Sequence, residues 1–270
     1  GITRSLRYTL PSIEAHVLAP ARQAGETRVF AHFFDQSRID NPRTGEALEV
    51  DPEDYRLLAP DAVELEPPGA CLAAWDYPRI EAAGDTWHDG HRSVRNLVHQ
   101  LHSLDRVTRL ATPWAPDLWI YARPDLRYHD SLAPILARAA AGPDETVWLP
   151  LWLWRGGLND RFAVIRGARA AQAYGTRARR MHAFCTATGG PLHAERLLRF
   201  ALADTAIRRI ASRATRIRAN GAESWESFSF DALETLHGRL EAGGAPQIAK
   251  RLGHRSLQQV QRVLDLFYPR

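Results

Sequence analysis

The sequence predicts an α/β protein with a single domain, built on a mostly parallel central sheet with helices on both faces. Short apolar segments rich in β-branched and aromatic residues alternate with longer segments of helical periodicity, the pattern that produces parallel sheets covered by helices. The 270 residues suffice for one sizeable core, and neither a repeat nor a low-complexity linker divides them. We therefore expect one domain over residues 1–225 and a helical C-terminal extension over residues 226–270 that packs on it.

Hydrophobic periodicity places the elements in order along the chain. Apolar residues spaced three and four apart predict helices over residues 8–21, 91–110, 131–141, 166–184, 192–203, 230–241 and 245–266. Apolar and aromatic runs predict strands over residues 28–34, 117–122 and 146–154. Residues 205–217 alternate in a way that fits either a helix or a strand.

A long acidic and proline-rich insert over residues 35–89 follows the first strand. It shows only hints of regular structure, namely a short alternating strand over residues 62–66 and a helix start at Asp51. Loops of this length inside a compact domain are usually functional or mobile. We therefore expect the insert to be irregular.

The net charge of +4 conceals an uneven distribution of charged residues. Residues 40–89 carry 13 acidic side chains against three arginines, whereas residues 161–220 carry 13 arginines against two acidic side chains. A basic face of this density attracts polyanions such as nucleotide diphosphates, anionic lipid head groups or nucleic acid. The alternative explanation is a solvated, arginine-rich helix surface.

Hydropathy and cysteine usage narrow the cellular location. No apolar stretch approaches the roughly 20 residues of a membrane span, and the polar start of the chain lacks the apolar segment of a secretory signal peptide. Cys71 and Cys185 have no metal-like spacing and do not suggest a disulfide framework. The cytoplasm is the simplest location, and the amphipathic C-terminal tail leaves open a peripheral contact with the inner face of the membrane.

Three polar turns directly follow predicted strands, where ligands bind in open parallel sheets. They comprise residues 32–35, 123–125 and 155–161. The Arg123-Pro124-Asp125 turn is stiff because proline restricts both itself and the preceding residue. Its guanidinium and carboxylate can bind a diphosphate and its Mg²⁺ or Mn²⁺ together. The alternative role for Asp125 is a helix cap, which is the role we expect for Asp130.

The turn at residues 155–161 offers an amide, a carboxylate and a guanidinium in succession on Asn159, Asp160 and Arg161. Two preceding glycines allow the backbone a tight turn or a close approach to a ligand. The trio can grip sugar hydroxyls, and Asp160 can take a proton from an acceptor hydroxyl. An ordinary surface turn is the alternative.

Two helices carry further candidates. Asn96, Gln100 and Ser103 form a polar stripe on the helix over residues 91–110, and Arg95 lies near its start, where the helix dipole favours an anion. Solvent exposure is the alternative explanation for such a stripe. Glu195 follows His193 at the start of another helix. The two side chains could form an acid/base pair or a pair of metal ligands, or His193 could have a purely structural role.

In their order along the chain, these segments resemble glycosyltransferase-like proteins with a GT-A-type, Rossmann-like nucleotide-binding fold. The most distinctive pieces are Arg123-Pro124-Asp125-Leu126 and Gly157-Leu158-Asn159-Asp160-Arg161-Phe162-Ala163. The other matching pieces are Arg4 with residues 8–13, residues 29–32, Asn96 with Gln100 and Ser103, and residues 192–195. The matching segments span residues 1 to about 200.

The resemblance implies transfer of a sugar from a nucleotide-diphosphate donor, usually with a divalent cation at an Asp-x-Asp turn. Asp125 would match the last carboxylate of that motif, whereas Arg123 replaces the first and brings metal dependence into question. The resemblance also implies a further strand before Gly1, ending where Arg4 meets the nucleotide.

From the residues and the resemblance we expect a glycosyltransferase acting on a glycan or lipid-linked hydroxyl acceptor in surface glycan or polysaccharide synthesis. The expected donor-binding residues are Arg4, His32, Arg95, Asn96, Ser103, Arg123 and Asp125, and Asp125 is the expected ligand of a Mn²⁺ or Mg²⁺ ion. The expected sugar-binding residues are Asn159, Asp160, Arg161 and Glu195, with Asp160 as the catalytic base. The alternatives are a basic nucleic-acid-binding protein, against which the acidic insert argues, and an inactive scaffold of the same fold.

Overall fold

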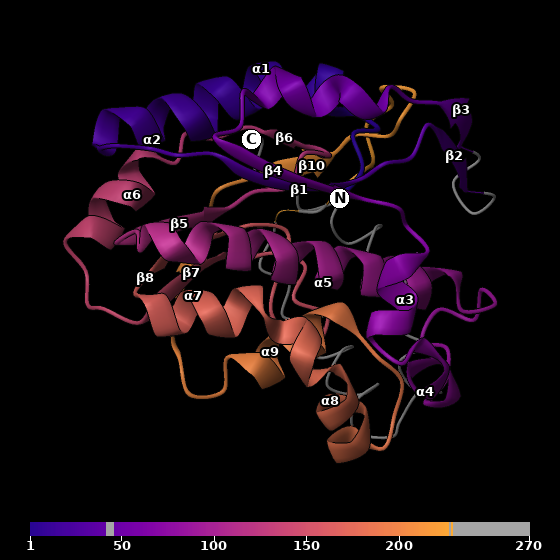
Figure 1. Cartoon of the computed structure of the whole chain (residues 1–270). Helices are drawn as coiled ribbons and strands as arrows, with labels where there is room; N and C mark the ends of the chain where they lie inside the picture. Colours follow the sequence, from indigo (N-terminus) through magenta and orange to yellow (C-terminus); the bar gives the residue numbers. More distant parts are fainter. Residues whose placement is uncertain (42–45, 227, 229–270) are drawn as a thin grey trace, which may run out of the picture.

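The computed structural model describes residues 1–41, 46–226 and 228, and it confirms the α/β class (Figure 1). Helices and several small sheets alternate along the chain, as the periodicity predicts. The two helices expected over residues 230–241 and 245–266 lie outside the described residues. No helix in the described part of the chain is long and apolar enough to cross a membrane.

The α-helices agree broadly with the predicted ones. They are α1 (Leu6–Ile13), α2 (Ala19–Ala24), α3 (Ala70–Ala74), α4 (Tyr77–Ala82), α5 (Arg92–Ala111), α6 (Ala133–Ala140), α7 (Ala168–Gly175), α8 (Met181–Thr188) and α9 (Ala194–Ala201). A π-helical turn over Glu14–Leu18 joins α1 to α2, so the predicted first helix is one continuous helical segment. Short 3₁₀ helices cover Pro52–Leu58, Thr112–Trp114 and Arg177–Arg180.

The strands include several that the periodicity did not predict. They are β1 (Phe30–Phe34), β2 (Arg38–Asn41), β3 (Glu46–Glu49), β4 (Ala62–Glu66), β5 (Leu118–Tyr121), β6 (Leu126–Tyr128), β7 (Thr146–Pro150), β8 (Ala163–Arg166), β9 (Ala206–Ile210) and β10 (Ala214–Arg216). The ambiguous segment over residues 205–217 therefore forms strands. The insert over residues 35–89 is not irregular as expected, because it contains β2, β3, β4, α3 and α4.

The central sheet was expected to be mostly parallel, but its largest described part is mostly antiparallel. One sheet has the order β5-β8-β7-β9, in which β8 pairs antiparallel with both neighbours and only β7 and β9 pair parallel. A parallel pair needs a crossover, usually helical, but the chain returns from β7 to β8 through an irregular loop. The other sheets are the parallel pair β1-β4 and the antiparallel pairs β2-β3 and β6-β10.

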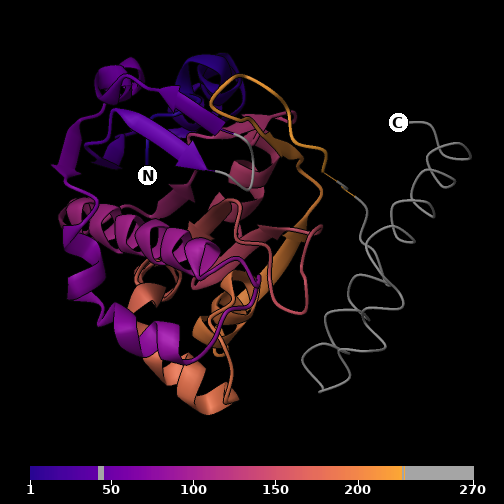
Figure 2. The same ribbon diagram turned by 90° about the vertical axis from the view of Figure 1, so that its right-hand side faces the viewer.

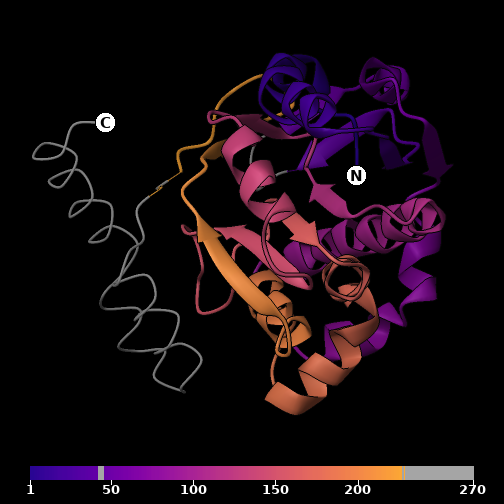
Figure 3. The ribbon, with the colours of Figure 1, turned by 90° about the vertical axis from the view of Figure 1, so that its left-hand side faces the viewer.

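Helices cover both faces of the four-stranded sheet, and Figure 3 shows α6 and α7 on either side of it. Successive residues of a strand point to opposite faces. Accordingly, Trp148 of β7 packs in one core cluster with Leu136 of α6, whereas Val147 packs in another with Ala171 of α7 and Leu198 of α9. A third cluster joins α5 to α4, α8 and α9. These layers hold the polar strand ends described below.

Candidate functional site

A cavity of about 1340 Å³ lies beside the ends of β1 and β5 and the loop that follows β7. It brings together ten of the eleven predicted site residues: Arg4, His32, Arg95, Asn96, Ser103, Arg123, Asp125, Asp160, Arg161 and Glu195. The three polar turns that the sequence singled out therefore meet in space. The remaining predicted residue, Asn159, does not line the cavity.

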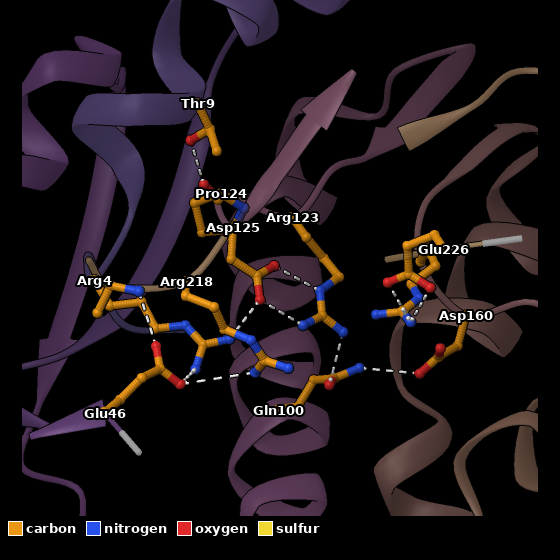
Figure 4. A network of polar contacts seen from close by, with 12 residues as sticks. Arg4, Thr9, Glu46, Gln100, Arg123, Pro124, Asp125, Asp160, Arg218 and Glu226 are labelled. Carbon is orange, nitrogen blue, oxygen red and sulfur yellow. Dashed lines mark hydrogen bonds and ion pairs between the residues drawn. The ribbon is translucent and has the colours of Figure 1, made fainter. Parts of the chain in front are cut away.

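The Asp125 carboxylate lies between two arginines at the centre of the site (Figure 4). Arg123 donates from Nε to Oδ1 at 2.9 Å and from Nη2 to Oδ2 at 2.8 Å. Arg4, from just before α1, donates a third hydrogen bond to Oδ2 at 2.8 Å. Burial alone would raise the pKa of Asp125, but the charges of Arg123 and Arg4 outweigh it and hold the pKa well below its usual range.

Neighbouring elements fix the backbone of the same turn. Thr9 of α1 donates its hydroxyl to the Pro124 carbonyl at 2.6 Å, and the Ile217 amide donates to the Asp125 carbonyl at 2.8 Å. The Arg123 amide donates to the Tyr128 hydroxyl at 3.0 Å. The stiffness expected from proline is thus reinforced by contacts from the N-terminal helix and from the segment after β10.

The expected metal role of Asp125 does not fit this arrangement. Both carboxylate oxygens accept hydrogen bonds from guanidinium groups, and two positive charges lie within contact distance. A hard divalent cation needs free anionic oxygens, which Asp125 does not offer while it is held this way. The site is organised by arginines at the position where the resemblance implied a metal.

Gln100 of α5 links this pair to Asp160 (Figure 4). Its Oε1 accepts from Arg123 Nη1 at 3.0 Å, and its Nε2 donates to Asp160 Oδ2 at 3.1 Å. Burial would raise the pKa of Asp160, but the charges of Arg123, Arg177 and Arg161 lower it. Asp160 is therefore an ionised carboxylate surrounded by three guanidinium groups, and its one hydrogen bond in the described structure comes from Gln100.

Three arginines that line the cavity have N–H groups without a hydrogen-bond partner among the described residues. These atoms are Arg161 Nη1, Arg177 Nε and Arg216 Nε, and all three are buried. Arg177 is 1% exposed, donates from Nη1 to the Tyr174 carbonyl at 2.8 Å, and lies 4.5 Å from the centre of the Tyr174 ring. Buried donors normally find a partner, so each of these arginines has a donor that a ligand in the cavity could satisfy.

Arg161 is held from its other side by the C-terminal segment of the described chain. Its Nη2 donates to Glu226 Oε1 at 3.1 Å, and both side chains are at most 10% exposed. The Arg161 amide donates to Asn159 Oδ1 at 2.8 Å, while Asn159 Nδ2 donates to the Trp152 carbonyl at 2.6 Å. Asn159 is 1% exposed and does not line the cavity, so in this structure its amide holds the turn and does not face a ligand.

Glu195, in the first turn of α9, is the second carboxyl group in this part of the cavity. Burial, and then the charge of Asp160, raise its pKa to about 7. Gly157 packs directly on its backbone, so closely that a Cβ atom on Gly157 would overlap the Glu195 carbonyl. Two carboxyl groups whose environments move their pKa values apart form the usual arrangement of an acid/base pair.

His193 precedes Glu195 and is a weak candidate for proton transfer. Its Nδ1 lies 3.3 Å from Glu195 Oε2, and its ring stacks on Trp87 at 6.0 Å between centroids. Burial, followed by the charges of Arg196 and Arg155, lowers the pKa of His193 to about 4. The ring is therefore neutral near pH 7, and His193 directly precedes α9, which carries Glu195 in its first turn.

The remaining predicted residues lie at the edges of the cavity. Arg95 and Asn96 are exposed on α5, and the Arg95 guanidinium lies 5.5 Å from the centre of the Tyr77 ring.

Asp130 does not cap a helix as expected. Its carboxylate accepts from the Arg213 backbone amide at 2.8 Å and from Arg213 Nη2 at 2.8 Å.

A separate cluster of His32, Glu66 and His102 has the residue types of a metal site. The indole N–H of Trp75 donates to His102 Nδ1 at 2.8 Å, and indole is a donor only. His102 therefore carries its proton on Nε2, the atom that contacts Glu66. His32 Nε2 lies 2.7 Å from the same Glu66 oxygen, and His32 Nδ1 lies 2.9 Å from Ser103 Oγ. These contacts explain the cluster as a hydrogen-bonded support for β1, β4 and α5.

Sequence reasoning missed several residues of the site. Arg177 lies in a run of four residues with three arginines, where nothing in the sequence marks one of them as buried. Glu46 lies in the acidic insert, yet it is within 3.7 Å of Arg218 and 4.0 Å of Arg4. Gln100 belongs to the polar stripe of α5, but its link between the two turns depends on the fold.

The chain matches no protein-family model, no curated protein and no solved structure at a significant level.

Asp125→Asn should lower the free energy of unfolding by about 3 kcal/mol or more, because it leaves two arginine charges without their buried partner. Asp130→Asn is the matched control, because its partly exposed pair with Arg213 is worth at most about 1 kcal/mol. Urea denaturation at pH 7 measures both. Equal losses in the two variants would contradict the central place given to Asp125.

Glu195→Gln should stabilise the protein at pH 8 and lose this advantage at pH 5. With a pKa raised from 4.5 to about 7, the folded state holds the Glu195 proton between these pH values and the unfolded state releases it. Wild-type stability from this group is thus present below pH 4.5 and lost as the pH rises through 7, a change of about 2 kcal/mol between pH 5 and 8.

Urea denaturation at both pH values tests this expectation. Glu49→Gln, at an exposed position on β3, is the matched control for the removal of one carboxylate. A Glu195→Gln effect that does not depend on pH would show that the carboxyl group ionises normally.

Proposed function

We propose that the protein is a glycosyltransferase that uses a nucleotide-diphosphate sugar and holds the diphosphate with arginines in place of a metal ion. The observation that carries this proposal is that Arg161, Arg177 and Arg216, which line the cavity with Asp160 and Glu195, each have a buried N–H group without a partner among the described residues. Guanidinium groups match the geometry of phosphate oxygens and donate strong, charge-assisted hydrogen bonds.

An anion of moderate size suits this cavity better than a long polymer. Residues 161–220 do not form a free basic face as the composition allowed. Among the described residues, at least six of their arginines form ion pairs, namely Arg161, Arg166, Arg169, Arg179, Arg213 and Arg218. Arg161 and Arg177 of the cavity are at most 9% exposed, so a small anion can approach them more easily than the backbone of a duplex.

The cavity also contains side chains that could bind the sugar and the nucleobase of the donor. Asp160 is an ionised carboxylate that can accept hydrogen bonds from sugar hydroxyls. Trp225 lines the same cavity with its side chain 59% exposed, and an indole face of this kind can stack on a sugar or a nucleobase. Arg123 lies between Asp125 and Gln100 with its orientation fixed, as a catalytic cation requires.

The proposed chemistry is the displacement of the nucleoside diphosphate at the anomeric carbon. The acceptor oxygen forms the new bond, the bond between the anomeric carbon and the phosphate oxygen breaks, and the electron pair leaves with the diphosphate. Arginines stabilise the charge that develops on this leaving group. In an inverting reaction a carboxylate takes the acceptor proton, and Glu195, with a pKa of about 7, is better matched to this step than Asp160, the base expected from the sequence.

A nucleotide-selective rise in melting temperature is the expected result of a thermal-shift panel of UDP, GDP, CMP, dTDP and their sugars in excess EDTA. Arg177→Lys keeps the charge but removes the Nε donor, so we expect about a 10-fold to 100-fold weaker binding of the selected nucleotide sugar. Arg169→Lys is the matched control, because Arg169 is 78% exposed and does not line the cavity.

The proposal fails if no nucleotide or nucleotide sugar shifts the melting temperature. A shift produced only by duplex DNA or RNA, declining steeply with salt, would support the nucleic-acid alternative. Binding of a nucleotide sugar without turnover on any hydroxyl acceptor would support the inactive scaffold.

A further inference from the structure

The Glu226 carboxylate holds a donor of Arg161 that a bound phosphate would need. Its Oε1 accepts from Arg161 Nη2 at 3.1 Å, and its Oε2 lies 3.4 Å from the same nitrogen. A guanidinium binds a phosphate most strongly through two parallel N–H groups, and both pairs that it can offer, Nε with Nη2 and Nη1 with Nη2, include Nη2. Both side chains line the cavity, and Figure 4 shows Glu226 on the same side of the site as Asp160. Glu226 therefore occupies the donor that either arrangement requires.

Glu226 lies at the end of the segment over residues 217–226, which follows β10 and which we call the strap. The start of the strap is fixed on the site, because the Ile217 amide donates to the Asp125 carbonyl at 2.8 Å. The strap then turns back on itself, so that Ile217 bridges to Glu223 in antiparallel fashion. Figure 2 shows it in orange at the edge of the described fold. Its last three residues line the cavity.

Asp125 and Glu226 both pair with arginines, but the two carboxylates differ in how well their surroundings stabilise the charge. The charges of two arginines hold the pKa of Asp125 well below its usual range. Burial raises the pKa of Glu226, because it outweighs the charges of four nearby arginines. A raised pKa means that the ionised carboxylate is less stable in this position than in water. Asp125 is thus the fixed partner of the arginines, and Glu226 is the exchangeable one.

A diphosphate is a stronger partner for Arg161 than Glu226 is. It carries more negative charge than one carboxylate and presents more acceptor oxygens to guanidinium groups. The cavity also offers it the buried Nε donors of Arg177 and Arg216, which have no partner among the described residues. Binding of a diphosphate at Arg161 can therefore compensate for the loss of the contact with Glu226.

Displacement of Glu226 needs only the rotation of its side chain. The neighbouring Trp225 is 59% exposed, so this part of the strap borders the solvent. Beyond Glu226, the Phe228 ring contacts the Trp152 ring at 5.1 Å between centroids, which holds the backbone in place. The carboxylate can therefore turn into water while the strap stays on the fold.

We propose that Glu226 is an internal competitor for the phosphate site, and that the diphosphate of the donor displaces its carboxylate from Arg161. The inference rests on the proposed function, because it requires Arg161 to bind a phosphate group. Competition of this kind lowers the affinity for every anion and rejects those that carry no more charge than a carboxylate. It also favours release of the nucleoside diphosphate after transfer, since Glu226 returns to Arg161 as the product leaves.

Calorimetric titration with pyrophosphate in excess EDTA tests this proposal on three forms of the full chain: wild type, Glu226→Gln and Glu223→Gln. Glutamine at position 226 keeps an oxygen that can accept from Arg161 but removes the charge. Glu223→Gln is the matched control on the same strap. Glu223 is 45% exposed, lies 3.0 Å from Arg127 and does not line the cavity.

The Glu226→Gln variant should bind pyrophosphate about tenfold more tightly than the wild type, whereas Glu223→Gln should stay within about twofold of it. The tenfold ratio should persist when the salt concentration rises from about 50 to about 500 mM, because buried charge pairs are screened much less than exposed ones. Without pyrophosphate, the melting temperature of Glu226→Gln should lie within a few degrees of the wild-type value, which checks that the variant folds.

Equal affinity of Glu226→Gln and the wild type would overturn the proposal. Weaker binding by Glu226→Gln would also overturn it, because Glu226 would then orient Arg161 for the ligand. A ratio that disappears at high salt would do the same, since the charge would then act at a distance. These three results leave the arginine-based diphosphate site standing, whereas an absence of binding by both forms would overturn that site as well.

Discussion

The contact between the Asp125 carboxylate and the guanidinium groups of Arg123 and Arg4 is the interaction on which the site depends. It joins the turn after β5 to the segment before α1, and Gln100 extends it through α5 to Asp160. The charges are mostly removed from water, so each partner would be costly without the others. The pair therefore couples the assembly of three sequence-distant segments to the geometry of the cavity.

The same coupling underlies the proposal that arginines, and not a metal ion on Asp125, bind an anion in this cavity. Arg161, Arg177 and Arg216 also keep buried donors without partners among the described residues. Leaving such groups unsatisfied costs stability. Proteins commonly tolerate such a cost where a ligand supplies the missing partner.

Local periodicity predicted much of the fold. The helix expected over residues 91–110 is α5, and the strand expected over residues 62–66 is β4. The antiparallel position of β8 was not predictable, because its short apolar run merges with the helix that follows it. The helices of the acidic insert were missed because they are only five and six residues long and lie in proline-rich sequence.

For the site, the sequence identified the turns but not their electrostatics. A motif can suggest that Asp125 binds a metal, but only the fold brings Arg4 from 121 positions away to neutralise it. Likewise, the raised pKa of Glu195 comes from burial and from Asp160. Charge balance in a cavity is a long-range property, and a single sequence contains little information about it.

The most direct test of an arginine-based phosphate site is calorimetric titration of the full chain with pyrophosphate, once in excess EDTA and once with excess Mn²⁺. Arginine coordination predicts binding in EDTA, with an affinity within a few-fold of that measured with manganese. Binding that is detectable only with manganese would contradict it, and would mean that a metal ion displaces the arginines from Asp125.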